Sequence, residues 1–472
     1  MNRRYLAIDL GAESGRAMLA SLADRKLELH ELHRFPNTPV SLPTGLYWDT
    51  LRIFHEICEG LRLGARQTDQ LDGIAVDTWG VDFGLLGPEG ALLDNPRHYR
   101  DTRNHGVPEK VFKKVSRKDI FNETGIQVME INSLYQLYAI HLHSPWRLEA
   151  AHRLLFMPDL LNYFLTGVEC SERTIASTSQ FYNPVTKAFA TDMLRRLGIT
   201  AGFLGNLVDP GTHLGPVLPY VAEQTGLEID TPVYAVGGHD TASAVAAVPT
   251  SGGENWCYIS SGTWSLMGVE LDAPIINEHA MKANFTNEVG VAGKIRFLKN
   301  IAGLWLIQEC RRAWAREGHE YTYAQLMELA AAAKPLDTVI DPDAFYAPGD
   351  HPRRISQHCN ATGQTVPEDV GSLCRVILHS LAVRYKEVLS TIERLTGRRI
   401  DVIHIVGGGS RNRLLNQLAA NVTGRRIVAG PAEATAAGNA LTQSMGAGDL
   451  ASLEEMRDIV RRSFTVEEFL PQ

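Results

Sequence analysis

The sequence predicts an α/β protein of two tandem lobes with similar topology, residues 1–247 and 248–472. The first observation is length, because 472 residues exceed what one hydrophobic core usually organises. The second is a repeated order: each half begins with a three-strand meander and continues with helices that alternate with single strands. The third is composition, since 44% apolar and 21% charged residues are ordinary for a folded globular protein.

The first half shows this order directly. A helix is predicted over residues 49–66, because Leu51, Phe54, Ile57 and Leu61 recur at helical spacing and Asp49 is placed to cap it. Short apolar runs predict strands, with a glycine-bearing turn between the first two. These strands are expected at residues 5–8, 17–21, 27–35, 74–76 (ending at Asp77) and 232–236 (ending at Gly237-Gly238).

The second half repeats the order. Its strands are expected at residues 256–259, 264–271, 295–298, 402–406 and 427–429, and its helices at about 370–395, 413–422 and 433–445. Two regions, 85–230 and 270–370, do not fit the repeat and are interpreted as insertions, where substrate specificity is often determined. The small-residue stretch 248–253 suits a hinge between the lobes.

Charge and cysteine content narrow the class of protein. A formal net charge of −8 disfavours a nucleic-acid surface or a polybasic membrane patch. A phosphorylated ligand would therefore need backbone amides and a divalent cation. Six cysteines without a CxxC pair argue against a zinc ribbon and a disulfide scaffold. Cys359 and Cys374 are close enough in sequence to pair, but two reduced thiols are the favoured interpretation.

The N-terminus predicts a cytoplasmic protein. An acidic residue, Asp9, interrupts the chain before an apolar signal region can form. No apolar run has the length of a membrane span. We expect a monomer or small homo-oligomer with neither a nucleic-acid nor a membrane partner.

The turn at residues 9–16 is the first candidate for phosphate binding. Gly11 and Gly15 allow a tight turn, and backbone amides with the Ser14 hydroxyl can donate to phosphate oxygens. Asp9, at the end of a buried strand, is placed to hold a water molecule on Mg²⁺. A plain hairpin turn is the alternative.

Two further turns suggest a nucleotide site in the second half. Residues 407–412, with three consecutive glycines, follow a strand and open a helix, where a nucleotide can contact bare backbone. Residues 260–263 occupy the place that 9–16 have in the first half, so one loop from each lobe would hold a triphosphate. A tight strand-to-helix link is the alternative for 407–412.

Asp240 is the candidate catalytic base. It lies in the segment 237–244, after two glycines and before a small-residue helix, so a substrate hydroxyl can approach its carboxylate. The alternative is a helix N-cap. His239 is either a hydrogen-bond partner of the substrate or a core histidine.

The chain lacks the sequence motifs of several other enzyme classes. The chain has no GxxxxGK[ST], no HExxH and no Gly-x-Ser-x-Gly. Residues 82–84 read Asp-Phe-Gly, but without the other protein-kinase motifs we interpret this as a chance match within a strand.

The motifs together resemble the FGGY carbohydrate kinases, of the actin, hexokinase and Hsp70 superfamily. The resemblance extends from residue 5 to about residue 440, and its motifs lie at residues 7–16, 77–83, 99–101, 238–244, 260–268, 299–308 and 405–417. It implies two ribonuclease H-like lobes of the actin-like ATPase type with a catalytic cleft between them. The first would carry the sugar site, the first phosphate loop and the catalytic aspartate, and the second would bind the nucleotide.

The resemblance also implies the chemistry and the residues that perform it. The expected reaction transfers the γ-phosphoryl group of ATP to O1 of L-rhamnulose, with Mg²⁺ bridging the phosphates and Asp240 as general base. The implied sugar-binding residues are Gly80, His239, Asp240, Thr241 and Asn300. The implied ATP-binding residues are Ala12, Glu13, Ser14, Gly15, Arg16, Thr263, Gln308 and Gly408.

Some positions remain open. Glu13 stands where relatives often carry a small hydroxyl residue, so we expect its side chain to point away from the phosphates. Gln308 has an ordinary helix-surface role as its alternative, and Asn300 a helix-capping role. The alternative functions are phosphorylation of another ketose, such as L-fuculose or xylulose, and a non-catalytic, actin-like role as sugar sensor or filament protein.

Overall fold

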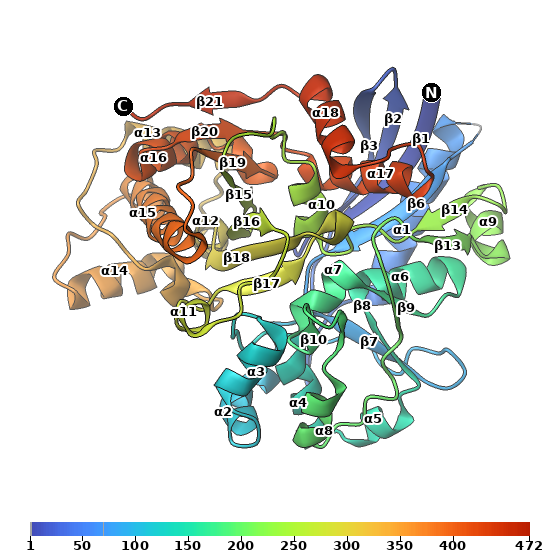
Figure 1. The fold of residues 1–472 in the computed structure, drawn as a ribbon. Coiled ribbons are helices and arrows are strands. Elements are labelled where there is room, and N and C mark those ends of the chain that lie inside the picture. The colour runs from blue at the N-terminus through green and yellow to red at the C-terminus, as the bar shows by residue number, and fades with distance from the viewer. Residues whose placement is uncertain (1, 69) are drawn as a thin grey trace. The chain divides into compact units, whose positions relative to one another are not determined.

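The computed structural model describes residues 2–68 and 70–472, which form two compact units (Figure 1). The first unit consists of Met1–Ala247 together with two later segments, Glu270–Phe297 and Ala434–Ser463. The second consists of Val248–Val269, Leu298–Glu433 and Phe464–Gln472. Three stretches of sequence therefore fold together in each unit.

The first unit is organised around a six-stranded sheet in the order β13-β14-β6-β1-β2-β3. Its strands are β1 (Asn2–Leu10), β2 (Ser14–Ala23), β3 (Lys26–Pro36), β6 (Gly73–Thr78), β13 (His213–Pro216) and β14 (Pro232–Tyr234). The first three strands form the predicted antiparallel meander, and β6 adds in parallel to β1. The parallel pairing places Asp9 directly beside Asp77.

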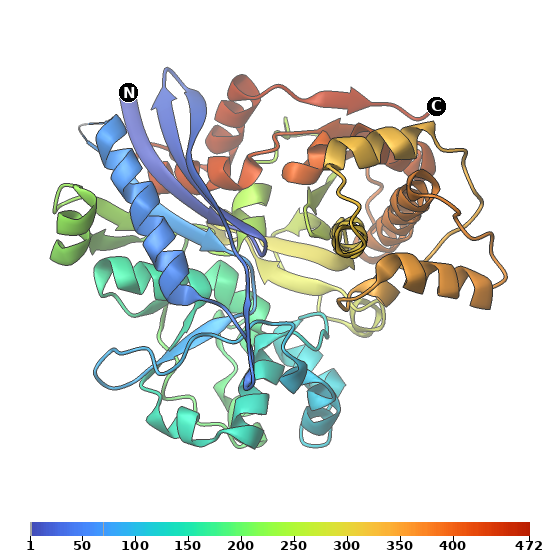
Figure 2. The same cartoon turned by 180° about the vertical axis from the view of Figure 1, so that it is seen from behind.

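Helices cover the two faces of this sheet. On one face α1 (Thr50–Gln67) approaches closely enough that a Cβ at Gly60 would lie 2.5 Å from Cβ of Ala17. On the other face Ala436 of α17 (Ala434–Gly446) packs against Ala7 and Met18. Since neighbouring residues of a strand point to opposite faces, α1 and α17 sandwich the sheet, as Figures 1 and 2 show from the two sides.

The region 85–230, interpreted as an insertion, packs largely around an apolar core of its own, which includes Leu134, Phe156, Phe181 and Leu194. The remaining helices of the first unit are α2 (Val107–Phe112), α3 (Arg117–Thr124), α4 (Ser133–His143), α5 (Trp146–Ala150), α6 (Met157–Thr166), α7 (Arg173–Ala176), α8 (Thr191–Leu197), α9 (Pro219–Thr225), α10 (Asp240–Ala246), α11 (Glu278–Lys282) and α18 (Leu453–Ser463). Its shorter strands are β4 (Val40–Leu42), β5 (Gly45–Tyr47), β7 (Phe83–Leu86), β8 (Arg153–Phe156), β9 (Cys170–Glu172), β10 (Tyr182–Asn183), β11 (Ala188–Phe189), β12 (Asn206–Val208) and β17 (Thr286–Val289).

The second large sheet repeats the strand order of the first. Its order is β17-β18-β16-β15-β19-β20-β21, and the division between the units passes through β16 and β18. Its strands beyond β17 are β15 (Trp256–Ser261), β16 (Trp264–Leu271), β18 (Ile295–Ala302), β19 (Val402–Val406), β20 (Arg426–Ala429) and β21 (Glu467–Phe469). As β1 pairs with β2 and β6, β15 pairs antiparallel with β16 and parallel with β19, so the predicted repeat is confirmed.

Five helices belong to the second unit. They are α12 (Trp305–Arg316), α13 (Tyr323–Ala332), α14 (His351–Ala361), α15 (Val370–Thr396) and α16 (Arg413–Thr423). The long predicted helix is α15, whose N-cap Asp369 accepts a hydrogen bond from the backbone N–H of Ser372 at 2.8 Å.

All six cysteines of the chain are free and buried, Cys359 and Cys374 included.

One local prediction is wrong and another is correct. The turn expected over residues 9–16 is shorter, because β1 continues to Leu10 and β2 begins at Ser14. Gly15 therefore lies within a strand, and a Cβ there would come within 2.3 Å of the Phe35 ring. The predicted cap of α1 is correct, since the Asp49 side chain accepts from the Arg52 N–H.

Candidate active site

Three carboxylates gather where β1, β6 and α10 meet in the first unit. Asp9 and Asp77 are register partners at the ends of their strands. Thr78 bridges to His239, and its N–H donates to the carbonyl of Gly238 at 2.9 Å, which brings the start of α10 to the same edge. Burial, followed by the negative charge of Asp9, raises the pKa of Asp77 well above its ordinary value.

Polar partners offset part of this like-charge repulsion. Arg16 is the register partner of Asp9 across the hairpin and forms an ion pair with its carboxylate. The side-chain amide of Asn439, in α17, donates to Asp77 Oδ2. Asp77 is fully buried and its partner is the neutral amide of Asn439, whereas Asp9 is paired with the cationic Arg16.

Asp240 is the accessible acid of the group. Its side chain keeps 28% exposure, and the Thr241 hydroxyl donates to its Oδ1 at 3.1 Å. Asp240 is the first residue of α10 and His239 is the N-cap, so the capping interpretation of Asp240 is wrong. Burial raises the pKa of Asp240, the charge of Asp9 adds to the increase, and His239 opposes it.

The two glycines before His239 are required by close packing. A Cβ at Gly237 would lie 2.9 Å from the backbone nitrogen of Ser243, and a Cβ at Gly238 would lie 2.9 Å from Glu172 Oε2. Glu172 is buried and accepts hydrogen bonds from the Gly238 N–H, at 3.0 Å, and from Thr174. The Gly-Gly pair thus lets the chain approach a buried carboxylate that holds its backbone.

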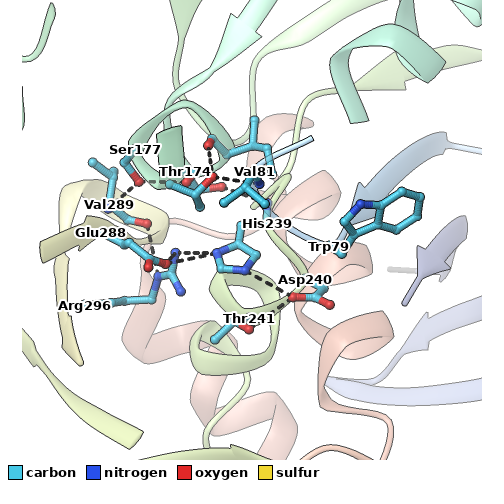
Figure 3. A network of polar contacts seen from close by, with 12 residues as sticks. Trp79, Val81, Thr174, Ser177, His239, Asp240, Thr241, Glu288, Val289 and Arg296 are labelled. Carbon is cyan, nitrogen blue, oxygen red and sulfur yellow. Dashed lines mark hydrogen bonds and ion pairs between the residues drawn. The ribbon is translucent and has the colours of Figure 1, made fainter. Parts of the chain in front are cut away.

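Hydroxyl groups of α7 and the turn after it hold three surrounding segments in place (Figure 3). Thr174 accepts from the His239 N–H at 3.2 Å, and Ser177 accepts from the Val289 N–H at 2.9 Å. Thr178 accepts from the Val81 N–H at 3.1 Å. The segments that carry Gly80, His239 and Glu288 are therefore fixed to one short element.

The loop after β6 brings Gly80 beside His239. A Cβ at Gly80 would lie 3.4 Å from His239 Nε2. Val81 adopts φ of 69°, which a β-branched residue rarely tolerates. Its conformation is held by the bond to Thr178 and by Ser133, which donates to the Val81 carbonyl at 2.5 Å.

Asp82 anchors the same loop from beneath. It is fully buried, and burial raises its pKa to about 6. Its Oδ2 accepts from the indole N–H groups of Trp48 at 2.6 Å and Trp79 at 3.0 Å, while Oδ1 accepts from Gln136 at 2.8 Å. One carboxylate therefore fixes the tryptophan that precedes Gly80.

We expect Asp82→Asn to destabilise the protein by about 1–3 kcal/mol, because a donor replaces one acceptor oxygen in a buried site. Urea unfolding followed by tryptophan fluorescence measures the change, and the native emission should also shift because Trp48 and Trp79 lose a charged partner. Unchanged stability and emission would show that the hydrogen bonds from Trp48, Trp79 and Gln136 to this carboxylate contribute little.

The loop between β1 and β2 is closed and pinned. The Gly11 N–H donates to the Ser14 carbonyl at 2.9 Å, and the Asn37 side-chain amide donates to the Gly11 carbonyl at 2.9 Å. It has the form of a short hairpin turn that is partly exposed at Ala12, Glu13 and Ser14.

The predicted nucleotide residues of the second unit also lie together. Gln308, in α12, donates from Nε2 to the Thr263 hydroxyl at 3.2 Å, and Thr263 lies in the turn between β15 and β16. The glycine turn 407–409 packs on the same turn, since a Cβ at Gly407 would lie 3.0 Å from the Ser261 carbonyl. A Cβ at Gly408 would meet none of the described atoms within 4 Å.

Asn300 lies in β18 and not at a helix end. The N-cap of α12 is Leu304, so the capping alternative for Asn300 is wrong. Gln308 is partly exposed on α12, and its side chain donates to Thr263, which is compatible with both interpretations of this residue.

Sequence reasoning missed four residues of this region. Asp77 was recognised only as a strand end, although its place beside Asp9 was an available signal. Glu172, Glu288 and Arg296 were not recognised, because they lie in regions interpreted as insertions and carry no motif. The structure identifies them as charged residues that are almost completely buried: Glu172, Glu288 and Arg296 have relative exposures of 1%, 4% and 0%.

Comparison with known proteins identifies the family to which this chain belongs. The C-terminal domain model of the FGGY family of carbohydrate kinases matches residues 257–447, and the N-terminal domain model matches residues 4–247. The chain belongs to the FGGY family of carbohydrate kinases. Family membership implies an ATP-dependent sugar kinase, and a divalent metal ion is typical of such kinases.

Individual relatives agree along the whole chain. The chain is 44% identical to a rhamnulokinase of Bacteroides thetaiotaomicron over all of this chain and 96% of that protein. It is 40% identical to a rhamnulokinase of Enterococcus faecalis over 98% of this chain and 94% of that protein.

Solved structures share the fold. A xylulose kinase from Lactobacillus acidophilus superposes with a TM-score of 0.80 at 16% identity, covering 100% of this chain and 94% of that one. A glycerol kinase from Plasmodium falciparum with ADP gives 0.77 at 15% identity, covering 100% and 94%. The predicted two-lobed α/β fold is confirmed.

Among the described residues, no helix combines the length and apolarity that a membrane crossing requires. The same residues contain no group of three or more His, Cys, Asp or Glu side chains arranged to hold a metal ion directly.

Proposed function

We propose that this FGGY kinase transfers the γ-phosphoryl group of ATP to O1 of L-rhamnulose, giving L-rhamnulose 1-phosphate and ADP in L-rhamnose catabolism. The observation that carries the proposal is the partly exposed Asp240 carboxylate beside His239 and Gly80, in a chain that resembles rhamnulokinases over its full length. Another ketose, such as L-fuculose or xylulose, is the alternative substrate.

Asp240 is proposed as the general base. Its carboxylate accepts the O1 proton as the oxygen attacks the γ-phosphorus atom, and the Thr241 hydroxyl orients it through the bond to Oδ1. Burial raises the pKa of Asp240, which makes its carboxylate a better proton acceptor than that of an ordinary aspartate. Gly80, His239, Thr241 and Asn300 are proposed to contact the sugar.

Mg²⁺ is the proposed metal, and the chemistry of the acids fits it. Magnesium usually keeps several waters and binds one or two carboxylates together with substrate phosphates, which agrees with the lack of a three-ligand cluster among the described residues. Asp9 would hold it through water, and it would neutralise phosphate charge when bound. The repulsion that raises the pKa of Asp77 also favours a nearby cation.

The residues proposed to bind the nucleotide are 12–16 in the first unit, and Thr263, Gln308 and Gly408 in the second. Arg16 would interact with phosphate oxygens from the end of β2. Gly408 offers backbone unobstructed by a side chain, as close contact with adenosine requires. The proposed location is the cytoplasm, where ATP is available.

A panel of ketoses tests the proposal. Purified protein, ATP and Mg²⁺ are incubated with L-rhamnulose, L-fuculose, xylulose or no sugar, and ADP release is followed by a coupled assay. The largest kcat/KM is expected for L-rhamnulose. Greater activity with another ketose would select the alternative substrate. If no sugar in the panel causes ADP release, the non-catalytic sensor would be favoured.

The pH dependence of kcat/KM should show an acidic limb above the ordinary range of aspartate. Only ionised Asp240 accepts the proton, so activity falls as pH drops through its raised pKa. A pH series with saturating ATP and limiting L-rhamnulose measures the limb. A limb that stays at the ordinary aspartate value would contradict the buried environment inferred for this base.

A further inference from the structure

A buried ion pair contacts the side of the His239 ring that faces away from Asp240 (Figure 3). Arg296 Nη2 lies 3.1 Å from His239 Nδ1 and 3.1 Å from Glu288 Oε2. Glu288 Oε2 is itself 3.1 Å from the same ring nitrogen. On the opposite side of the ring, Nε2 lies 3.5 Å from Asp240 Oδ1.

Arg296 is a rigid donor in this arrangement. Its side chain has no exposed surface, and its Nε donates to the Val289 carbonyl at 3.1 Å. Val289 is in turn bound to Ser177 through its N–H. A guanidinium group held at several points loses little freedom when it makes one more hydrogen bond.

The chemistry of the contacts selects a protonation state for the ring. A guanidinium can only donate, so the hydrogen bond from Arg296 requires a lone pair on Nδ1. The carboxylate of Asp240 on the other side prefers an N–H on Nε2. Glu288 Oε2 lies at the same distance from Nδ1 but makes no hydrogen bond among the described residues, so it serves to balance the charge of Arg296. The contacts of Arg296 and Asp240 therefore favour the neutral imidazole that carries its proton on Nε2.

We propose that Arg296, paired with Glu288, sets the tautomer of His239 so that Nε2–H is a donor to a substrate oxygen beside Asp240. Arg296 and Glu288 are positioning residues in this proposal, since they act through the ring. It rests on the proposed function for its kinetic test, but the tautomer itself can be measured without any sugar.

The direct test is a ¹⁵N-histidine NMR spectrum of the full chain without ligands, in which His239 is assigned by the signals that His239→Asn removes. The expected state has Nε2 protonated and Nδ1 unprotonated. In the double variant Glu288→Gln/Arg296→Met, which removes both charges, this preference should weaken, because Asp240 is then the one contact of the pair that still favours a proton on Nε2. A ring protonated on Nδ1, or on both nitrogens, in the wild type would overturn the proposal.

The second test is a cycle of variants measured by L-rhamnulose binding in calorimetry and by KM for L-rhamnulose and for ATP. We expect Glu288→Gln/Arg296→Met to weaken sugar binding about tenfold while KM for ATP stays within about twofold. Added to His239→Asn, the double change should weaken binding no further, because its effect passes through the ring. Full additivity, or unchanged sugar affinity, would contradict the proposal.

Two controls separate folding from positioning. Asp449→Asn removes a buried carboxylate that accepts from Arg3 and Tyr5, and it should leave KM for L-rhamnulose unchanged. Arg296→Lys keeps the charge without the planar donor, so it should fold and still weaken sugar binding. If wild-type protein phosphorylates a different ketose, that sugar replaces L-rhamnulose in the cycle, while the NMR result stands by itself.

Discussion

Asp240→Asn is expected to lower kcat by about 10²- to 10⁴-fold, the range that a positioned general base contributes. The amide cannot accept the O1 proton, yet it has nearly the size of the carboxylate and can still accept the hydrogen bond from Thr241. ATP and sugar affinity should therefore change little. Steady-state kinetics with L-rhamnulose, together with calorimetric binding of each substrate, measures the two quantities separately.

The control for this variant is Asp192→Asn, which removes an exposed carboxylate from α8. It should have wild-type turnover, so a loss confined to Asp240→Asn reports the role of that carboxylate and not the net charge. Turnover close to wild type in Asp240→Asn would remove Asp240 as the base. A parallel loss of sugar affinity would instead make it chiefly a binding residue.

The residues predicted from the sequence share a local signal. Asp9 lies at the end of a strand, Asp240 comes soon after one, and the glycines at 407–409 directly follow one, so each lies near the end of a strand in its own sheet. The repeat of the meander identified the equivalent turn at 260–263. Such features depend on neighbours in the chain, so strand pattern and glycine placement were enough to find them.

The residues that sequence analysis missed depend on distant partners. Glu172 receives its hydrogen bond from Gly238, 66 positions away, and Arg296 meets His239 across 57 positions. No periodicity indicates that a charged residue will be buried against such a partner. Gly15 shows the same limit, because it was interpreted as a turn glycine although the Phe35 ring is what excludes a side chain there.

The two helices behind the acid cluster approach each other too closely for any side chain at Gly438. A Cβ at this position of α17 would lie 1.8 Å from the backbone carbonyl oxygen of Ser243, in α10. The Ser243 hydroxyl is itself buried and donates to the Gly237 carbonyl at 2.8 Å. Backbone held in this way cannot shift without disturbing the turn that carries Asp240.

Gly438→Ala is consequently expected to destabilise the first unit by about 3 kcal/mol or more, since overpacking against backbone leaves no flexible atom to yield. The first unit is larger than 250 residues, and with about 2.1 cal/mol/K of unfolding entropy per residue its unfolding midpoint should fall by about 5 °C. Differential scanning calorimetry measures the shift. Because Asn439, the next residue, donates to Asp77, any folded fraction should also show reduced turnover.

Gly64→Ala provides the matched control, a glycine-to-alanine change in α1 on the other face of the same sheet. Its added methyl would meet two leucine side chains, Leu6 at 3.2 Å and Leu32 at 3.8 Å, and no backbone among these nearest atoms. The gain in helix propensity, about 1 kcal/mol, offsets these contacts, so the midpoint should stay within a few degrees of wild type. Equal effects of the two substitutions, or a stable and active Gly438→Ala protein, would contradict the claim that contact between α10 and α17 positions the catalytic turn.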